Sequence, residues 1–124
     1  MKLMRNAHAP HIDFNQLQGM IKSNPKVLPS DLDMILERRC QFLVGEWKRD
    51  GEHMSQGQLI LLQNLAKQPQ FHVIVIHGDT DGETVVNKFE SINKRGEFIH
   101  QGDSLDDLKG FINRWYDYAD RGQA

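Results

Sequence analysis

The stretch that decides the fold is residues 29–48, which read PSDLDMILERRCQFLVGEWK. It contains two largely apolar runs, 32–38 and 41–48, separated only by Arg39 and Cys40. Two such runs joined by two residues are typical of an antiparallel β-hairpin, in which the connecting pair forms the turn. The sequence therefore predicts a hairpin that turns at Arg39 and Cys40.

The predicted pairing brings charged side chains together at the open end of this hairpin. Asp33 lies opposite Glu46, and Asp31 lies opposite Lys48. Side chains two residues apart on a strand point to the same face, so Glu46 and Lys48 face the same way. Two neighbouring carboxylates can share a divalent cation, and a nearby ammonium can stabilise a developing negative charge. The hairpin therefore predicts a metal-dependent site at this end.

Three segments carry the start signals of helices. The first begins at Asp13, which is expected to act as its N-cap, and ends before Pro25. The second begins after Ser55, where Gln58 completes a capping box. The third begins at Ser104 and has acidic residues in its first turn, where they complement the helix dipole. Each segment has apolar residues at helical spacing, so each is expected to bury one face.

Three further strands complete the predicted sheet. Residues 71–77 form a nearly continuous β-branched run, which is typical of a strand buried on both sides. Looser runs at 84–92 and 97–100 predict the other two. The predicted order is α-β-β-α-β-β-β-α, a single α/β domain with a mixed central sheet flanked by helices. This domain is expected to cover 12–124, after a flexible N-terminal arm at 1–11.

The composition is that of an ordinary globular domain, with 39% hydrophobic and 26% charged residues and a formal net charge of −2. The acidic balance counts against a protein that coats nucleic acid, because such proteins are usually basic. A local basic patch of Arg38, Arg39 and Arg49 is expected to meet phosphates instead. The single cysteine excludes an internal disulfide, and no apolar run suits a membrane span. A cytoplasmic protein is therefore expected.

Asp33, the triplet Glu46-Trp47-Lys48, the hairpin that presents them, and the helix and buried strand that follow resemble the PD-(D/E)XK nuclease superfamily. Within it, they resemble virus-type replication–repair nucleases and Holliday-junction resolvases. The resemblance implies a restriction-endonuclease-like core and a magnesium ion, replaceable by manganese, held by Asp33, Glu46 and the backbone carbonyl of Trp47. It also implies that Lys48 orients or helps to deprotonate the attacking water.

The resemblance further implies a glutamine early in the helix that follows the site. Gln58 is the best placed candidate and Gln56 the second, although the capping box alone also accounts for Gln58. The superfamily places Pro directly before its Asp, whereas this chain has Asp31 in between, which is assigned to an outer shell. No glutamate occurs on the first predicted helix, and this departure favours one cation over two.

These residues predict a magnesium-dependent DNA endonuclease, selective for junctions or branched DNA. Small stand-alone chains of this kind are common in phage genomes, which favours a phage origin and the host cytoplasm. A homodimer is expected through the last helix, where Phe111, Trp115 and Tyr118 would form the contact. Trp115, Tyr116 and Tyr118 could alternatively stack on bases or belong to the core.

Other functions stay open. The acidic net charge and the missing helix glutamate favour a catalytically inactive nuclease-fold protein that binds DNA or a protein partner. A weaker hypothesis is a phage regulator that blocks a host nuclease. His8 and His11 suggest zinc, but no Cys or His cluster completes a four-ligand set. His77 is interpreted as structural or as a neighbour of the catalytic edge.

Overall fold

The chain divides into two compact units, Met1–Asp31 and Leu32–Ala124, and each is described by itself. The single domain predicted from the sequence begins at residue 12 instead. The arm expected at 1–11 lies outside the residues that the structure describes. The computed structural model describes residues 15–27, 29–79 and 82–122.

Among its described residues, the first unit contains one short 3-10 helix, η1 (Asn15–Leu17). The helix predicted from Asp13 is wrong, because the chain forms turns and bends after Leu17; Asp13 itself lies outside the described residues. The apolar face expected for this helix consists of Phe14, Leu17, Met20 and Ile21. Phe14 lies outside the described residues, and the other three are exposed. Isolated helices of about a dozen residues are marginal in water, so a segment that does not bury its apolar face does not stay helical.

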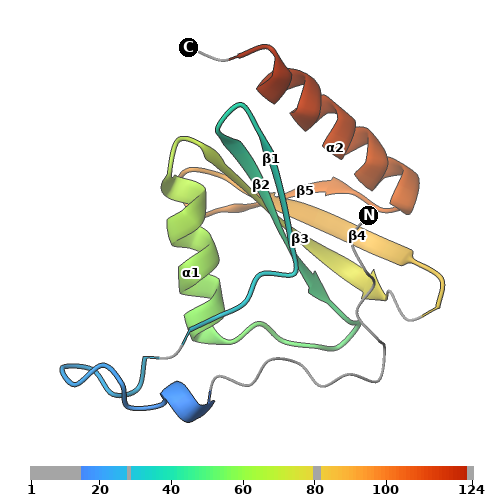
Figure 1. Ribbon diagram of the computed structural model, residues 1–124. Coiled ribbons are helices and arrows are strands. Elements are labelled where there is room, and N and C mark those ends of the chain that lie inside the picture. The colour runs from blue at the N-terminus through green and yellow to red at the C-terminus, as the bar shows by residue number, and fades with distance from the viewer. Residues whose placement is uncertain (1–14, 28, 80–81, 123–124) are drawn as a thin grey trace. The chain divides into compact units, whose positions relative to one another are not determined.

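The second unit contains a five-stranded mixed sheet and two helices (Figure 1). The strand order in the sheet, β1-β2-β3-β4-β5, follows the order along the chain. The elements are β1 (Met34–Arg38), β2 (Gln41–Lys48), α1 (Gln56–Lys67), β3 (Phe71–Asp79), β4 (Val85–Ile92), β5 (Phe98–Gly102) and α2 (Leu105–Asp120). The α/β class and the mixed sheet are thus confirmed, and the predicted order is wrong at its first helix.

The hairpin of β1 and β2 has the predicted register. β1 pairs antiparallel with β2 along its whole length, starting with Met34 opposite Gly45. The turn is formed by Arg39 and Cys40, whose positive φ angles of 50° and 64° suit a two-residue hairpin turn. The register brings the residue just before β1 opposite Glu46.

The helix α1 joins β2 to β3, and these two strands pair in parallel, as the mixed sheet predicted from the sequence requires of at least one pair. Ser55 caps α1, because its side chain accepts a hydrogen bond from Gln58 N. Ser104 caps α2 in the same way, through Asp107 N. Both helices therefore begin where the capping signals predict them, because a hydroxyl at the N-cap satisfies a backbone N–H that the helix leaves unpaired.

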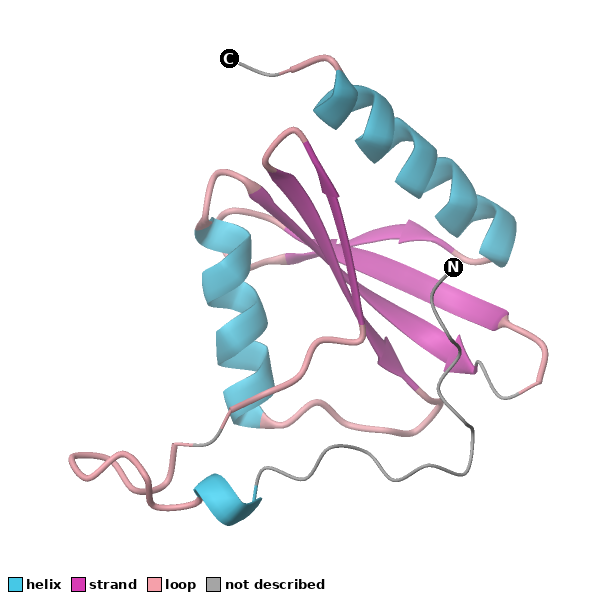
Figure 2. Cartoon of the chain, in the orientation of Figure 1, coloured by secondary structure: helices cyan, strands magenta, loops and turns pink. Residues whose placement is uncertain are grey.

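The two helices pack on the sheet (Figure 2), and each covers a hydrophobic core of its own, because alternate residues of a strand point to opposite faces. The core beneath α2 contains Leu43, Ile74, Ile76, Val86, Phe89, Leu108, Trp115 and Ala119. The core beneath α1 contains Val44, Leu62, Ala66, Val73, Val75 and Ile92. Trp115, predicted as a dimer contact, is only 7% exposed, so that part of the prediction is wrong.

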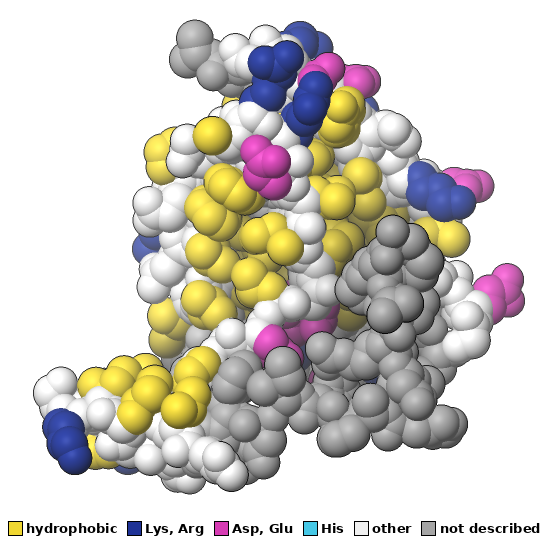
Figure 3. Space-filling model, in the orientation of Figure 1, with side chains coloured by type: hydrophobic (Ala, Val, Ile, Leu, Met, Phe, Trp, Pro, Cys, Tyr) yellow, Lys and Arg dark blue, Asp and Glu magenta, His cyan; other side chains and the backbone are white. Residues whose placement is uncertain are grey.

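Apolar side chains also remain at the surface of the second unit. Figure 3 shows a group of them in the middle of the face that carries the β1–β2 hairpin. Among the exposed apolar residues, Ile35 of β1 is 53% exposed and Ile60 of α1 is 48% exposed. Neither helix of the second unit, nor η1, is long and apolar enough to cross a membrane; this holds for the described residues.

Candidate functional site

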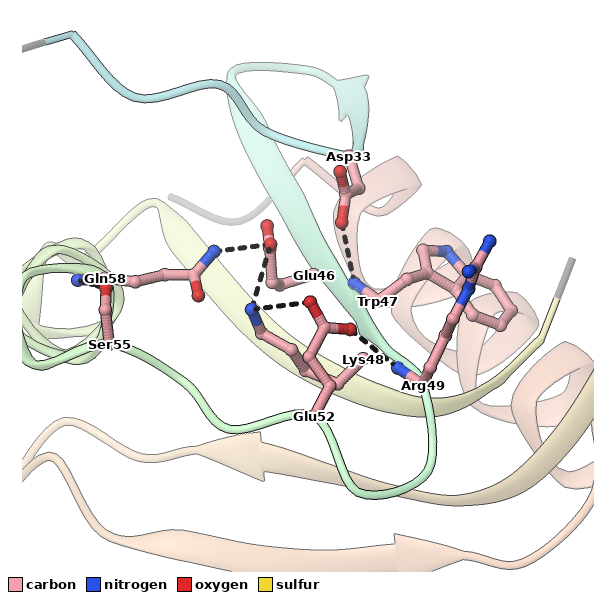
Figure 4. A network of polar contacts seen from close by, with 8 residues as sticks. All are labelled: Asp33, Glu46, Trp47, Lys48, Arg49, Glu52, Ser55 and Gln58. Carbon is pink, nitrogen blue, oxygen red and sulfur yellow. Dashed lines mark hydrogen bonds and ion pairs between the residues drawn. The ribbon is translucent and has the colours of Figure 1, made fainter. Parts of the chain in front are cut away.

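Glu46 and Lys48 lie at the carboxyl end of β2, on the face of the sheet that α1 covers (Figure 4). They share this face with Val44 of the α1 core, because residues two apart on a strand point the same way. Glu46 is 6% exposed and Lys48 is 7% exposed, and no other charged side chain of the described residues is buried. Burying charge is costly unless it is paired, so this pair needs an explanation other than stability.

The Glu46 carboxylate is held from two sides through one oxygen. Its Oε2 accepts a hydrogen bond of 2.5 Å from Gln58 Nε2 on α1 and lies 3.9 Å from Lys48 Nζ. Its Oε1 is buried and has no hydrogen-bond partner among the described residues. A buried oxygen without a partner is destabilising, and a bound cation or water would satisfy it.

Asp33 immediately precedes β1 and reaches the end of β2. Its Oδ2 accepts a hydrogen bond of 2.9 Å from Trp47 N, which fixes the carboxylate beside Glu46. Burial, and then the Asp33 charge, raises the pKa of Glu46 to about 7, while Lys48 and Gln58 oppose this rise. The two carboxylates therefore resist carrying full charge together, and a divalent cation between them would relieve that repulsion.

Gln58 lies at the site, and only half of the predicted capping box forms. Gln58 N donates to Ser55 Oγ at 3.2 Å, which is the expected cap. The Gln58 side chain, however, bonds Glu46 instead of turning back to the N-cap backbone. Gln56, the second candidate, is the exposed first residue of α1. The same residue thus supplies a helix cap through its backbone and a site contact through its side chain.

Glu52 is a site residue that the sequence analysis missed. Its Oε2 lies 3.9 Å from Lys48 Nζ, and its Oε1 accepts a hydrogen bond of 2.9 Å from Arg49 N. Glu52 belongs to the loop between β2 and α1, just after Gly51 with its φ of 80°. Loop residues carry no periodicity, and the only available signal was its spacing of four residues from Lys48.

The three arginines of the expected basic patch do not lie together. Arg38 and Arg39 are at the turn of the hairpin, at the opposite end from Glu46. Arg38 Nε donates a hydrogen bond of 2.6 Å to Asp120 Oδ1 at the end of α2. Only Arg49, which directly follows β2, adjoins the site (Figure 4). The expectation that Arg38 and Arg39 border the site is wrong, because the hairpin carries them away from it.

His77 lies next to the site, whereas the role predicted for Asp31 is not tested by the structure. His77 of β3 is the partner of Lys48 in the parallel ladder, so it lies next to the site. Its Nε2 is 3.2 Å from Glu90 Oε1, which gives the ring a structural partner. Asp31 belongs to the first unit, and its outer-shell role stays a prediction.

The side chains present fit one cation with few protein ligands. No group of three or more His, Cys, Asp or Glu side chains that could hold a metal ion occurs in the described part of the chain, and His8 and His11 lie outside it. Magnesium keeps several of its waters in proteins and needs only one or two carboxylates. The observation that fits such an ion is the buried, unpartnered Oε1 of Glu46 beside Asp33.

Comparison of the chain with protein-family models, with curated proteins and with solved structures finds no significant match. The function is therefore argued from the residues themselves. The structure brings together Asp33, Glu46, Lys48 and Gln58, and adds Glu52 to them.

Proposed function

We propose that this chain is a metal-dependent DNA nuclease of PD-(D/E)XK type that hydrolyses phosphodiester bonds. The observation that carries the proposal is the Glu46 carboxylate, which is buried beside Asp33 with its Oε1 unpartnered among the described residues. Carboxylates whose pKa is raised by burial and by a second carboxylate are common at functional sites. Keeping such a group buried lowers the stability of the folded protein.

The carboxylates and one backbone group would hold the ion. Asp33, Glu46 and the carbonyl of Trp47 are the proposed ligands of Mg²⁺, with Mn²⁺ as a substitute. When bound, the ion neutralises charge on the phosphate and on the leaving oxygen. Gln58 keeps the Glu46 carboxylate in one orientation through its hydrogen bond of 2.5 Å. Holding a ligand in place in this way maintains metal affinity.

Lys48 would position the attacking water. Its Nζ lies 3.9 Å from both Glu46 Oε2 and Glu52 Oε2, which is too far for a hydrogen bond to either. Both carboxylates attract the ammonium electrostatically, yet its N–H groups stay available to a water or a phosphate oxygen. An ammonium at this place orients the water and stabilises the charge that develops during attack.

The resemblance to PD-(D/E)XK nucleases supports four further properties of the proposed enzyme. These are a restriction-endonuclease-like core, selectivity for junctions or branched DNA, a phage origin and action in the cytoplasm. Arg49 is the proposed phosphate contact nearest the site, and Arg38 and Arg39 could meet only more distant phosphates. Symmetric cutting of a junction would need a twofold dimer, for which the outer face of α2 is proposed without the buried Trp115.

Cleavage assays on purified protein test the proposal. Duplex, single-stranded and four-way-junction DNA are incubated with Mg²⁺, Mn²⁺ or EDTA. We expect metal-dependent cutting that Lys48→Ala and Glu46→Ala each reduce by at least about 100-fold, the size seen when a charge-stabilising group is removed. The preferred substrate then identifies the DNA structure on which the enzyme acts.

Two variants control for folding. Lys67→Ala removes an exposed lysine from the last turn of α1 and should cut like the parent protein. Lys48→Met keeps most of the apolar stem of the buried lysine and should fold while remaining inactive. Full cleavage by Lys48→Met would rule out the role given to Lys48, and cutting in EDTA would rule out the metal.

A second candidate function is a catalytically inactive nuclease-fold protein that binds DNA or a protein. The observation that favours it is the small number of ligands, since in the described residues no third Asp, Glu, His or Cys joins the carboxylate pair. A melting curve separates the two. A working metal site should raise Tm with Mg²⁺ in the parent and not in Glu46→Ala, whereas an inactive site should leave both unchanged.

A further inference from the structure

A cavity lies between α2 and the start of β3, on the face of the sheet opposite to the Glu46 site. Its volume is about 230 Å³, and it is lined by His72, Phe111, Arg114, Trp115 and Tyr118. A neighbouring hollow of about 260 Å³ shares His72 and Phe111. Each is slightly smaller than the pockets of about 300–1,000 Å³ that take drug-sized ligands. The cavity therefore suits one ring system and not a large molecule.

The walls of this cavity are mostly aromatic. The His72 ring meets the Tyr118 ring edge to face, with centroids 5.5 Å apart. Phe111 makes a second edge-to-face pair with the buried Phe89, with ring centroids 5.6 Å apart. Rings held by other rings give a preformed surface on which a planar group can stack.

One wall residue carries a hydrogen-bond donor that the fold does not use. Trp115 is 7% exposed, and its Nε1 is buried without a hydrogen-bond partner among the described residues. An indole N–H is a donor only, and buried indoles normally have a partner.

The charges around the cavity are positive. The Arg114 guanidinium lies 6.0 Å from the Phe111 ring centroid at the cavity, and Lys94 lines the neighbouring hollow. No Asp or Glu is among the described residues that line either space. Burial, and then the Lys94 charge, lowers the pKa of His72, which keeps its imidazole neutral. The surroundings thus favour an anion next to a planar group.

We propose that this cavity binds an unstacked nucleotide, with the base stacked on the aromatic wall and the phosphate at Arg114. Bases stack on aromatic side chains whatever their identity, and an arginine pairs with phosphate in a defined geometry. The same chemistry is offered by a free mononucleotide and by an unpaired nucleotide in a strand. The inference does not depend on cleavage at Glu46, which lies on the other face of the sheet.

Calorimetric titration with thymidine 5′-monophosphate tests the site on the full chain. We expect binding that is weaker for thymidine, which lacks the phosphate, and absent for deoxyribose 5-phosphate, which lacks the base. Arg114→Gln should weaken binding about tenfold or more, since it removes a charged hydrogen bond. Tyr118→Leu should weaken it roughly five- to 150-fold by removing a stacking ring.

Lys109→Gln, an exposed change on the same helix but outside the cavity lining, should bind like the parent. Equal binding of deoxyribose 5-phosphate would mean that only the anion is recognised, and no binding or unchanged binding in both variants would overturn the proposal. Melting curves verify that the variants fold.

Oligonucleotides separate the two sources of the ligand. A DNA duplex with a single unpaired thymidine is compared with the same duplex in which that one base is missing. Loss of affinity on removing the base, abolished in Arg114→Gln, assigns the site to a strand. Binding of the mononucleotide alone assigns it to a free nucleotide. Binding is measured in EDTA, where the proposed metal-dependent cleavage cannot occur, so this test and the cleavage assay can fail separately.

Discussion

The two faces of the sheet bury different kinds of side chain. The core beneath α2 is built around large rings, with Phe89 and Trp115 among its members. The core beneath α1 contains only aliphatic side chains and borders the buried pair Glu46 and Lys48. The α2 face thus buries only apolar residues, whereas the α1 face combines an apolar core with a charged pair whose burial lowers stability. Mutations on each face can measure this difference.

The largest effect is expected on the α2 face. Phe89 is fully buried, so Phe89→Ala should lower the free energy of unfolding by about 3–5 kcal/mol, through lost contacts and the cavity left behind. Denaturant unfolding at one pH measures it. Ile60→Ala, at a position that is 48% exposed on α1, should cost less than about 1 kcal/mol. Similar losses for the two would contradict the burial assigned to Phe89 in the α2 core.

Removing the charge of Glu46 on the α1 face should raise the free energy of unfolding of the protein. The pKa of Glu46 is about 7 in the folded protein and 4.5 as the ordinary value. Between these values the folded state binds more protons than the unfolded state, so stability falls as pH rises from about 4.5 to 7. The loss amounts to about 3 kcal/mol without metal, which is the shift expressed as a free energy.

Glu46→Gln tests this sign, because glutamine cannot ionise. The variant should be more stable than the parent at pH 8 and equally stable at pH 4, as followed by denaturant unfolding without metal. Adding Mg²⁺ at pH 8 should stabilise the parent and leave the variant unchanged. Parallel pH curves for the two proteins would show that Glu46 does not carry the cost assigned to it.

A smaller effect is expected from Gln58, which joins α1 to the charged pair. Gln58→Ala should weaken Mg²⁺ binding about 10- to 100-fold, the usual effect of removing a group that orients a ligand. It should also raise the pKa of Glu46, since the Gln58 hydrogen bond lowers it. Metal titration and NMR titration of the Glu46 carboxyl measure the two. Gln56→Ala, two residues earlier on α1 and exposed, is the matched control and should change neither.

The smallest effects compare the two helix caps. Ser55→Ala and Ser104→Ala each remove an N-cap hydrogen bond and should each cost about 1 kcal/mol in thermal or denaturant unfolding. Only Ser55→Ala should also weaken Mg²⁺ binding, because it loosens the turn that carries Gln58. Equal metal affinity in both variants would separate the α1 cap from the site.

The parts of the fold that depend on local rules could be predicted from the sequence. The turn at Arg39 and Cys40 determines the register of the hairpin, and strand parity then places Glu46 and Lys48 on one face. Capping serines likewise mark the starts of α1 and α2. These rules involve residues close together in the chain, so no knowledge of distant contacts is needed.

What failed depends on distant contacts or on side-chain choice. The helix expected after Asp13 lacks a buried apolar face, which sequence periodicity alone cannot reveal. Arg38 bonds Asp120, a residue 82 positions away, so its removal from the basic patch had no local signal. From the sequence, the Gln58 side chain could bond either the N-cap backbone or Glu46. It bonds Glu46 because β2 lies beside α1, which the local sequence does not reveal.

The hairpin turn also offers a point of attachment for spectroscopy. Cys40 is the single cysteine of the chain and is exposed at the turn. It lies six residues from Glu46 along β2, which is about 20 Å at the rise of an extended strand. A fluorophore or spin label on this thiol needs no background mutations. It would report the approach of a DNA strand or a second copy from a distance that leaves the metal ligands undisturbed.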